Sequence, residues 1–284
     1  MERRLFYSPG TIVDALQLLD ETGGRLIAGG TDVIPQMRDG RFQSQHQIDM
    51  TRLTELRFIE EDGWIIRIGS LTTHDDIVHS NLLQREAAAL VQASSLIGAP
   101  QTRNRGTLGG NIGNASPAGD TLPPLLVVNA SVLLVSLNGE RTIQLSDFLR
   151  EPGQTAMAAG ELIHHIRFER LHEGTGTVFQ RLGTRAGMAI SIASTAIALR
   201  LDENGIVKDA RIALGAVAPT AIRCPKTEAT LMTQKCTENL IQASAEAAAR
   251  ECSPIDDVRA TAAYRRRAVE HLVRRALHNF LEKI

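Results

Sequence analysis

Two glycine-rich segments carry the residue types and spacing best suited to bind an anionic ligand. They are residues 28–33 (AGGTDV) and 105–120 (RGTLGGNIGNASPAGD), and the second contains five glycines and no lysine. Glycine lets the main chain approach a ligand closely, and successive backbone N–H groups can then form a nest for a phosphate. At the second segment, this chemistry favours phosphate or nucleotide binding over a simple turn, whereas Gly29-Gly30 alone is typical of a tight turn. Additional hydrogen bonds could come from Thr31, Thr107, Asn111 and Ser116.

Other common catalytic and metal-binding patterns are absent from the sequence. Neither glycine segment reads G-x-G-x-x-G after a strand or G-x-x-x-x-G-K-[ST], and no G-x-S-x-G elbow occurs. His164 and His165 lie on a predicted strand, where neighbouring side chains point to opposite faces. His74 and His79 are five residues apart and do not share a helix face. We therefore expect no catalytic residue and no metal ligand in this chain.

The elements around the first glycine segment follow from its flanking patterns. Thr11 is the expected N-cap of a helix with apolar residues at helical spacing, and Gly23-Gly24 ends it. A short buried strand (25–28) leads into the glycines, and Thr31 is the expected N-cap of the next helix. The second segment follows a predicted helix over 84–97 and precedes an apolar run at 122–130.

The rest of the pattern predicts an α+β protein with two domains. Turn signals at residues 61–63 and at Asn138-Gly139 predict two hairpins. The pattern relaxes over 169–176, so we place the domains at 1–172 and 173–284. The second domain has strands first and helices afterwards. Its last helix carries Arg265, Arg266 and Arg267, which we expect on a solvated face with partner docking as the alternative, whereas Met188 is expected in the core.

Composition excludes several classes of protein. A formal net charge of −1 and 4% aromatic residues give no reason to expect nucleic acid as a partner. The sequence contains no run of about eighteen apolar residues, so it predicts no membrane span. The three cysteines are far apart and lack a C-x-x-C pattern, which favours a cytoplasmic protein with reduced thiols and no iron–sulfur or zinc site of its own.

The two glycine segments together resemble a known family. AGGTDVIP (28–35), followed by QTRNRGTLGGNIGNASPAGDTLP (101–123), is similar to the FAD-binding medium subunit of the molybdenum hydroxylases, the xanthine dehydrogenase and carbon monoxide dehydrogenase family. GAVAPTAIR (215–223) and PIDDVRATAAYRRRAVEHLVRRAL (254–277) resemble the closing part of that subunit. The resemblance covers essentially the whole chain. It implies an FAD-binding domain of the p-cresol methylhydroxylase and vanillyl-alcohol oxidase type, split into two α/β subdomains, and a smaller α+β flavoprotein domain.

The resemblance also implies which residues bind FAD without a covalent bond. One side of the pyrophosphate cradle would come from the first segment: Ile27, Ala28, Gly29, Gly30, Thr31, Asp32 and Val33. The second side would come from Thr107, Leu108, Gly109, Gly110 and Asn111, with Ser116 nearby. The flavin ring would lie near Ile97 and Asp120, and Leu162 matches an apolar position that contacts the cofactor. Arg181 falls where many relatives carry Lys, and Ala189 where many carry Asp.

The implied function is electron transfer within a heteromeric complex. Electrons from a molybdenum cofactor in a large subunit would pass through [2Fe–2S] clusters in a small subunit to this FAD, and then to NAD, oxygen or quinone. The family assembles as a dimer of heterotrimers. Two alternatives remain open: an independent flavin-dependent oxidase or dehydrogenase on the same scaffold, and a non-catalytic nucleotide-binding assembly module. The first is disfavoured because the second domain has only Phe179, Tyr264 and Phe280 as aromatic residues.

Overall fold

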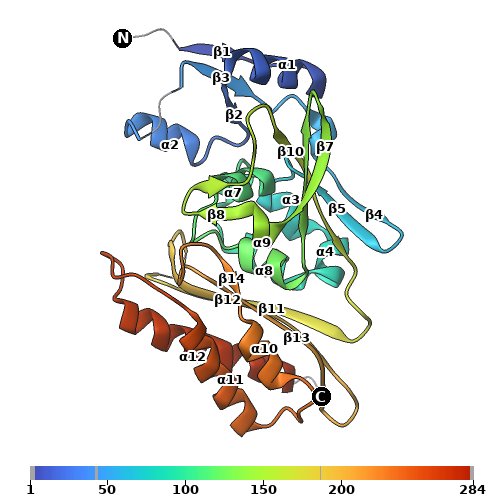
Figure 1. Ribbon diagram of the computed structural model, residues 1–284, viewed down its shortest axis with the longest axis vertical. Coiled ribbons are helices and arrows are strands. Elements are labelled where there is room, and N and C mark those ends of the chain that lie inside the picture. The colour runs from blue at the N-terminus through green and yellow to red at the C-terminus, as the bar shows by residue number, and fades with distance from the viewer. Residues whose placement is uncertain (1–3, 42–43, 186, 282–284) are drawn as a thin grey trace.

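The chain begins with a small parallel sheet and two helices. The computed structural model describes residues 4–41, 44–185 and 187–281 (Figure 1). The strands pair in the order β1-β3-β2, all parallel. These first elements are β1 (Leu5–Tyr7), α1 (Ile12–Thr22), β2 (Arg25–Ile27), α2 (Val33–Arg38) and β3 (His46–Asp49). Helix α1 is capped by Thr11 and ends at Gly23, which is left-handed with a φ of 58°, so this prediction is confirmed. Thr31 is not the N-cap of α2, because Asp32 takes that place without a side-chain capping bond.

A five-stranded antiparallel sheet follows, in the order β4-β5-β10-β6-β7. Its elements are a 3₁₀ turn (Thr54–Leu56), β4 (Ile59–Asp62), β5 (Ile65–Gly69), β6 (Ser131–Ser136), β7 (Gly139–Gln144) and β10 (Leu162–Glu169). Both predicted hairpins are present. The prediction for the histidines is wrong: a bulge between Ile163 and His165 breaks the alternation of β10. The Nδ1 atoms of His164 and His165 lie 2.9 Å apart as a result.

Short helices cover this sheet and form the centre of the molecule. They are α3 (His74–His79), α4 (Asn81–Glu86), α5 (Ala88–Ser95), α6 (Pro100–Arg103), α7 (Leu108–Asn114), α8 (Leu122–Val127) and α9 (Leu145–Phe148), with the small hairpin β8 (Leu149–Glu151) and β9 (Gln154–Thr155). The predicted single helix over 84–97 is wrong, because Ala87 has a φ of −149° and separates α4 from α5. The glycine-rich segment contains helix α7 at its centre rather than being a loop throughout.

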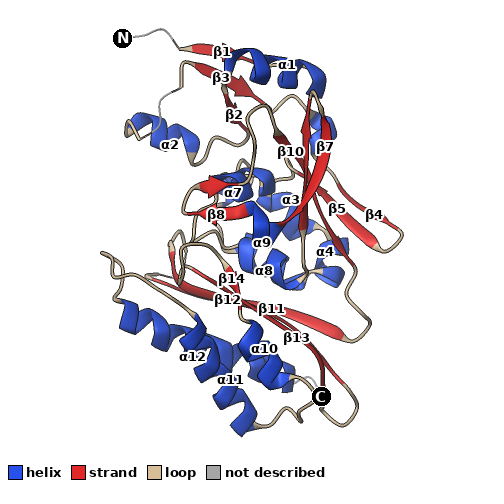
Figure 2. Cartoon of the chain, in the orientation of Figure 1, coloured by secondary structure: helices blue, strands red, loops and turns tan. Residues whose placement is uncertain are grey.

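The C-terminal part, from β11 to α12, is a four-stranded antiparallel sheet with helices on its outer face (Figure 2). Its elements are β11 (Thr175–Gly183), β12 (Ser191–Leu201), β13 (Val207–Gly215), β14 (Ile222–Arg223), α10 (Pro225–Leu231), α11 (Glu238–Glu251) and α12 (Ala262–Leu281). Ile197 and Leu199 of β12 face the helices. Ala196 and Ala198 face the N-terminal part, β1 to β10, and share its core. Because these residues are small, the two parts pack closely; the α+β prediction is confirmed.

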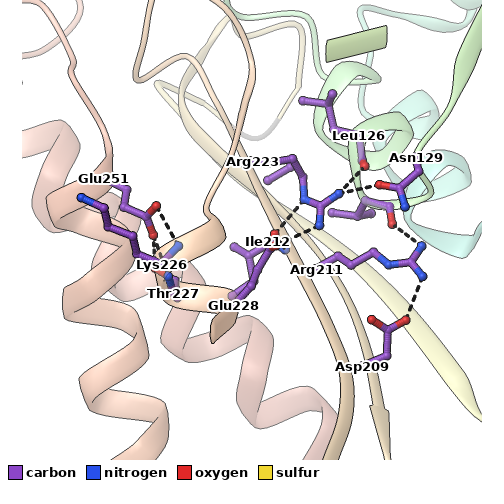
Figure 3. A network of polar contacts seen from close by, with 12 residues as sticks. Leu126, Asn129, Asp209, Arg211, Ile212, Arg223, Lys226, Thr227, Glu228 and Glu251 are labelled. Carbon is purple, nitrogen blue, oxygen red and sulfur yellow. Dashed lines mark hydrogen bonds and ion pairs between the residues drawn. The ribbon is translucent and has the colours of Figure 1, made fainter. Parts of the chain in front are cut away.

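Polar side chains of the C-terminal sheet hold one helix of the N-terminal part. Arg223 donates from Nη1 to the carbonyl of Leu126 at 3.1 Å, while its other donors pair with Glu228 (Figure 3). Arg211 donates to the carbonyl of Val127 at 3.3 Å. The last carbonyls of α8 lack partners within the helix, so these arginines fasten the C-terminal end of α8 to the C-terminal part.

Two other predictions for the C-terminal part fail in whole or in part: Arg266 and Arg267 are exposed as expected, but Arg265 is not, and Met188 is not in the core. Arg265 is only 3% exposed, and it donates to the carbonyls of Ile192 and Ala216 and to Asp257. It therefore does not belong to a solvated helix face. Met188 is 60% exposed and has a φ of 52°, because it lies in the turn that joins β11 to β12 rather than in the core.

Candidate functional site

A cavity of about 660 Å³ lies between the parallel sheet and the five-stranded sheet. This volume falls within the range of ordinary cofactor and small-molecule sites. Three stretches supply most of its wall: the first glycine segment, the second glycine segment with α7, and residues 153–163. The two glycine segments, about 75 residues apart in the sequence, therefore meet at one site.

The first glycine segment presents free backbone donors. Gly30 has a φ of 74°, which turns the chain sharply before α2. The N–H groups of Gly29, Gly30, Thr31, Asp32 and Val33 donate no hydrogen bond to any described residue. Consecutive unsatisfied N–H groups around a residue with positive φ form an anion-binding nest. These donors belong to residues that line the cavity, so the segment can hold a phosphate without a lysine.

The N–H groups at the start of α7 are, in contrast, already used. Leu108 and Gly109 donate to the carbonyls of Thr72 and Ser70, each at 2.9 Å. Gly110 donates to Oγ1 of Thr107 at 3.1 Å. These bonds fix α7 to the chain that follows β5. From the residues alone, the sequence favoured phosphate binding at the second segment and a tight turn at Gly29-Gly30, whereas the structure leaves consecutive N–H groups free in the first segment.

The two glycine segments are in direct contact. A Cβ atom on Gly29 would lie 1.8 Å from the carbonyl oxygen of Arg105, so only glycine fits there. Beyond this point, Asn114 donates to Oδ2 of Asp32 at 3.1 Å, and Gln36 donates to Asn114 at 3.2 Å. Glycine in the first segment and these amides in α2 and α7 therefore hold the phosphate-binding segment against α7.

Most of the site residues expected from the sequence line the cavity: Ala28, Gly29, Gly30, Thr31, Asp32, Val33, Ile97, Thr107, Gly109, Gly110, Asn111 and Leu162. Five do not line it. Ile27 and Leu108 are buried at 5% and 0% exposure, and Ser116 accepts a hydrogen bond from the N–H of Ala118. Asp120 and Arg181 form an ion pair with 2.6 Å between Nη1 and Oδ2.

The Asp120–Arg181 pair is buried between the two parts of the molecule. Each side chain is 7% exposed, and Ser191 donates from Oγ to the other oxygen of Asp120 at 2.6 Å. Burial raises the pKa of Asp120, and the Ser191 hydroxyl and the Arg181 guanidinium oppose that rise. The pair joins β11 to the chain just before α8.

Sequence reasoning missed two parts of the cavity wall. Apart from Leu162, residues 153–163, which join β8, β9 and β10, carry no motif, yet several of them line the cavity. His74 was considered only as a metal ligand, but it is 3% exposed and its ring lies beside Gly106. Burial, followed by the nearby charge of Arg103, lowers the pKa of His74 to about 4, so its imidazole is neutral near pH 7.

The described residues contain neither a candidate metal site nor a candidate membrane-spanning helix. No group of three or more His, Cys, Asp or Glu side chains in this part of the chain could hold a metal ion. Likewise, no helix within residues 4–41, 44–185 and 187–281 is long and apolar enough to cross a membrane.

The chain is similar to known proteins over nearly all of its length. Residues 2–168 match the family model described as the FAD binding domain in molybdopterin dehydrogenase, and residues 179–280 match the CO dehydrogenase flavoprotein C-terminal domain. The carbon monoxide dehydrogenase medium chain of Hydrogenophaga pseudoflava is 34% identical over 96% of this chain and 95% of its own length. The xanthine dehydrogenase FAD-binding subunit of Escherichia coli O157:H7 is 32% identical over 96% and 94%.

A solved structure agrees with the sequence comparisons. It is a carbon monoxide dehydrogenase from Hydrogenophaga pseudoflava that lacks the Mo-pyranopterin moiety of its molybdenum cofactor. One of its chains superposes with a TM-score of 0.94 at 34% identity, covering 99% of this chain and 98% of that one.

Proposed function

Because the chain belongs to the FAD-binding medium subunits of the carbon monoxide and xanthine dehydrogenase family, we propose that the cavity between its two sheets holds FAD and that the chain passes electrons from a partner subunit to a final acceptor. The family inferred from the glycine segments is thus confirmed, and with it the assignment as an oxidoreductase subunit. The observation that carries the proposal is the row of free N–H groups from Gly29 to Val33 beside a cavity of about 660 Å³.

The proposed placement of FAD follows from the chemistry of the cavity wall. The pyrophosphate would accept hydrogen bonds from the N–H groups of residues 29–33, where the contact between Gly29 and Arg105 leaves no room for a side chain. Thr107 and Asn111 would face the same group from α7. Ile97 supplies apolar surface that suits the flavin ring, whereas the Leu162 side chain is fully buried and would support the wall from the core. The other residues expected from the resemblance do not line the cavity and would support the residues that do: Ile27, Leu108, Ser116, Asp120 and Arg181.

The chain's own residues would bind and orient the cofactor rather than react. Flavin supplies one- and two-electron chemistry when bound, and the protein tunes it through hydrogen bonds and charge. The residues expected at the flavin include no nucleophile paired with a base. The only acid among them outside the first segment is Asp120, whose oxygens are already bonded to Arg181 and Ser191. This arrangement suits electron transfer better than substrate oxidation by this chain.

The proposed partners are a small subunit with [2Fe–2S] clusters and a large subunit with the molybdenum cofactor, assembled as a dimer of heterotrimers. Support comes from relatives whose names describe them as medium chains or as a subunit of a dehydrogenase complex. NAD, oxygen and quinone are the proposed acceptors. A cytoplasmic location is proposed as well, and the buried free thiols of Cys224, Cys236 and Cys252 agree with it.

The test is to purify the chain alone and together with the products of neighbouring genes, and to record absorption spectra. The proposal predicts a yellow protein that releases FAD on denaturation, with added iron–sulfur bands in the co-purified complex. A lone chain that turns over a substrate would favour an independent flavoenzyme. A colourless protein that binds ADP but cannot be reconstituted with FAD would favour a nucleotide-binding module instead.

A further inference from the structure

Strand β11 of the C-terminal part holds helix α5 at three points. Thr177 accepts from the N–H of Ala89 at 3.0 Å. Two residues later, the N–H of Phe179 donates to Oε1 of Gln92 at 2.7 Å. These residues alternate along the strand and so lie on one face. The next residue of that face is Arg181, which reaches the end of the helix.

The Arg181 guanidinium donates hydrogen bonds to two separate segments of the chain near the cofactor cavity. Its Nη2 donates to the carbonyl of Leu96 at 2.7 Å, and Leu96 directly precedes Ile97, which lines the cavity. Its Nη1 donates to Oδ2 of Asp120 at 2.6 Å. A single guanidinium therefore connects the turn after α5 with the turn before α8.

The residue after Asp120 contacts the cavity wall. Thr121 is 0% exposed and donates from Oγ1 to Oδ1 of Asn111 at 2.7 Å. Asn111 lies in α7 and lines the cavity. Two hydrogen bonds, Arg181 to Asp120 and Thr121 to Asn111, are thus joined by the peptide bond between Asp120 and Thr121 and connect β11 to α7.

We propose that Arg181 is a positioning residue that sets the separation of Ile97 and Asn111 and thereby the fit of the flavin. This inference rests on the proposed function, because it assumes that the cavity holds FAD. It differs from a direct contact with the cofactor: Arg181 does not line the cavity, and its two Nη atoms donate to the carbonyl of Leu96, to Asp120 and to the carbonyl of Ala189.

Arginine suits this role because its planar guanidinium offers several donors in a fixed geometry. Here the two Nη atoms serve three acceptors from three separate segments. A lysine has one ammonium group on a flexible stem, and it cannot reproduce these directions together. The Arg181→Lys variant therefore keeps the charge beside Asp120 and loses the geometry.

The experiment compares Arg181→Lys and Thr121→Val with Arg211→Lys in the full-length chain. Arg211 is the matched control, since it also joins the C-terminal part to α8, through Val127, and does not line the cavity. The measurements are the Kd for FAD by fluorescence titration, the visible circular dichroism of bound flavin, its midpoint potential, and the Tm of the FAD-free protein.

We expect Arg181→Lys to weaken FAD binding about tenfold and Thr121→Val about fivefold, the size of one lost buried hydrogen bond. Both should change the flavin circular dichroism in the same sense and shift the midpoint potential. Arg211→Lys should lower the Tm while leaving the Kd within about twofold.

Two outcomes would overturn the inference. In the first, Arg181→Lys and Thr121→Val change only the Tm and match Arg211→Lys in Kd and flavin spectrum. In the second, only Arg181→Lys affects the flavin, which would show that Arg181 acts on the flavin by a route other than Asp120, Thr121 and Asn111. Failure of the unaltered chain to bind FAD would instead refute the proposed function, so the two failures are distinguishable.

Discussion

Substitution of Gly29 by alanine tests the contact between the two glycine segments. The added Cβ would lie 1.8 Å from the carbonyl oxygen and 2.5 Å from the carbonyl carbon of Arg105. Both neighbours are backbone atoms, which cannot rotate away as a side chain can. Because real Cβ contacts stay beyond 3.0 Å, the two segments must separate by more than an ångström.

The expected cost has two parts. Overpacking of this kind destabilises a protein by about 1–3 kcal/mol. The separation also moves the N–H groups of residues 29–33 relative to α7, so a pyrophosphate can no longer contact both walls. Losing one or two hydrogen bonds to a charged group costs about 3 kcal/mol, which corresponds to a Kd raised about 100-fold.

The assay is a fluorescence titration of the FAD-free protein, together with thermal unfolding. Gly10→Ala is the control, because nothing lies within 4 Å of its Cβ position and its φ is not positive. A Gly29→Ala protein that binds FAD within about twofold of the unaltered chain would refute the reasoning, since it would show that the first segment does not contact the pyrophosphate or that the contact with Arg105 is not rigid.

Three further predictions concern stability. Arg265→Met should lower the free energy of unfolding by about 3–5 kcal/mol, because it leaves buried carbonyls and a carboxylate without their partner. Urea denaturation measures this change. The control Arg266→Met, at an exposed position, should leave the free energy of unfolding nearly unchanged. The pKa of His74 is lowered to about 4 from 6.5, so the unfolded chain binds a proton first as the pH falls. His74 then removes up to about 3 kcal/mol of stability between about pH 6.5 and pH 4. The free energy of unfolding, measured in urea at several pH values, should fall less steeply for His74→Gln and equally steeply for the exposed His172→Gln, while the similarly lowered pKa of His165 keeps part of the slope. Gly113→Ala in α7 should raise the Tm, gaining up to about 1 kcal/mol, because its Cβ would make an ordinary 3.6 Å contact with Ile163; a lower Tm would show that α7 needs glycine there.

Local patterns predicted the elements whose stabilising groups are close in sequence. Helix α1 has its cap, its apolar face and its terminating glycine within 13 residues, and it forms as predicted. The two hairpins depend on adjacent turn residues in the same way. Local patterns do not give element boundaries where a single residue changes the backbone, as at Ala87 between α4 and α5.

The glycine segments by themselves determined the kind of ligand, and with it the family. Closely spaced glycines beside a helix start have few uses other than a tight backbone or a phosphate contact. Their joint occurrence also located most of the cavity wall. The sequence did not indicate which segment keeps its N–H groups free, because that depends on carbonyls of Ser70 and Thr72 in another part of the chain.

Only the tertiary structure decided the roles of the charged and histidine side chains. Arg265 and Arg181 look like surface residues in their own segments, and they are buried because carbonyls and carboxylates from distant segments surround them. His164 and His165 meet because the pairing of β10 with β6 contains a bulge. Burial and hydrogen bonding depend on which segments pack together, and the residues next to a side chain in the sequence do not reveal that packing. The sequence thus determined the local elements, the ligand class and the family, while tertiary packing decided which side chains form the cavity wall and which ones hold it.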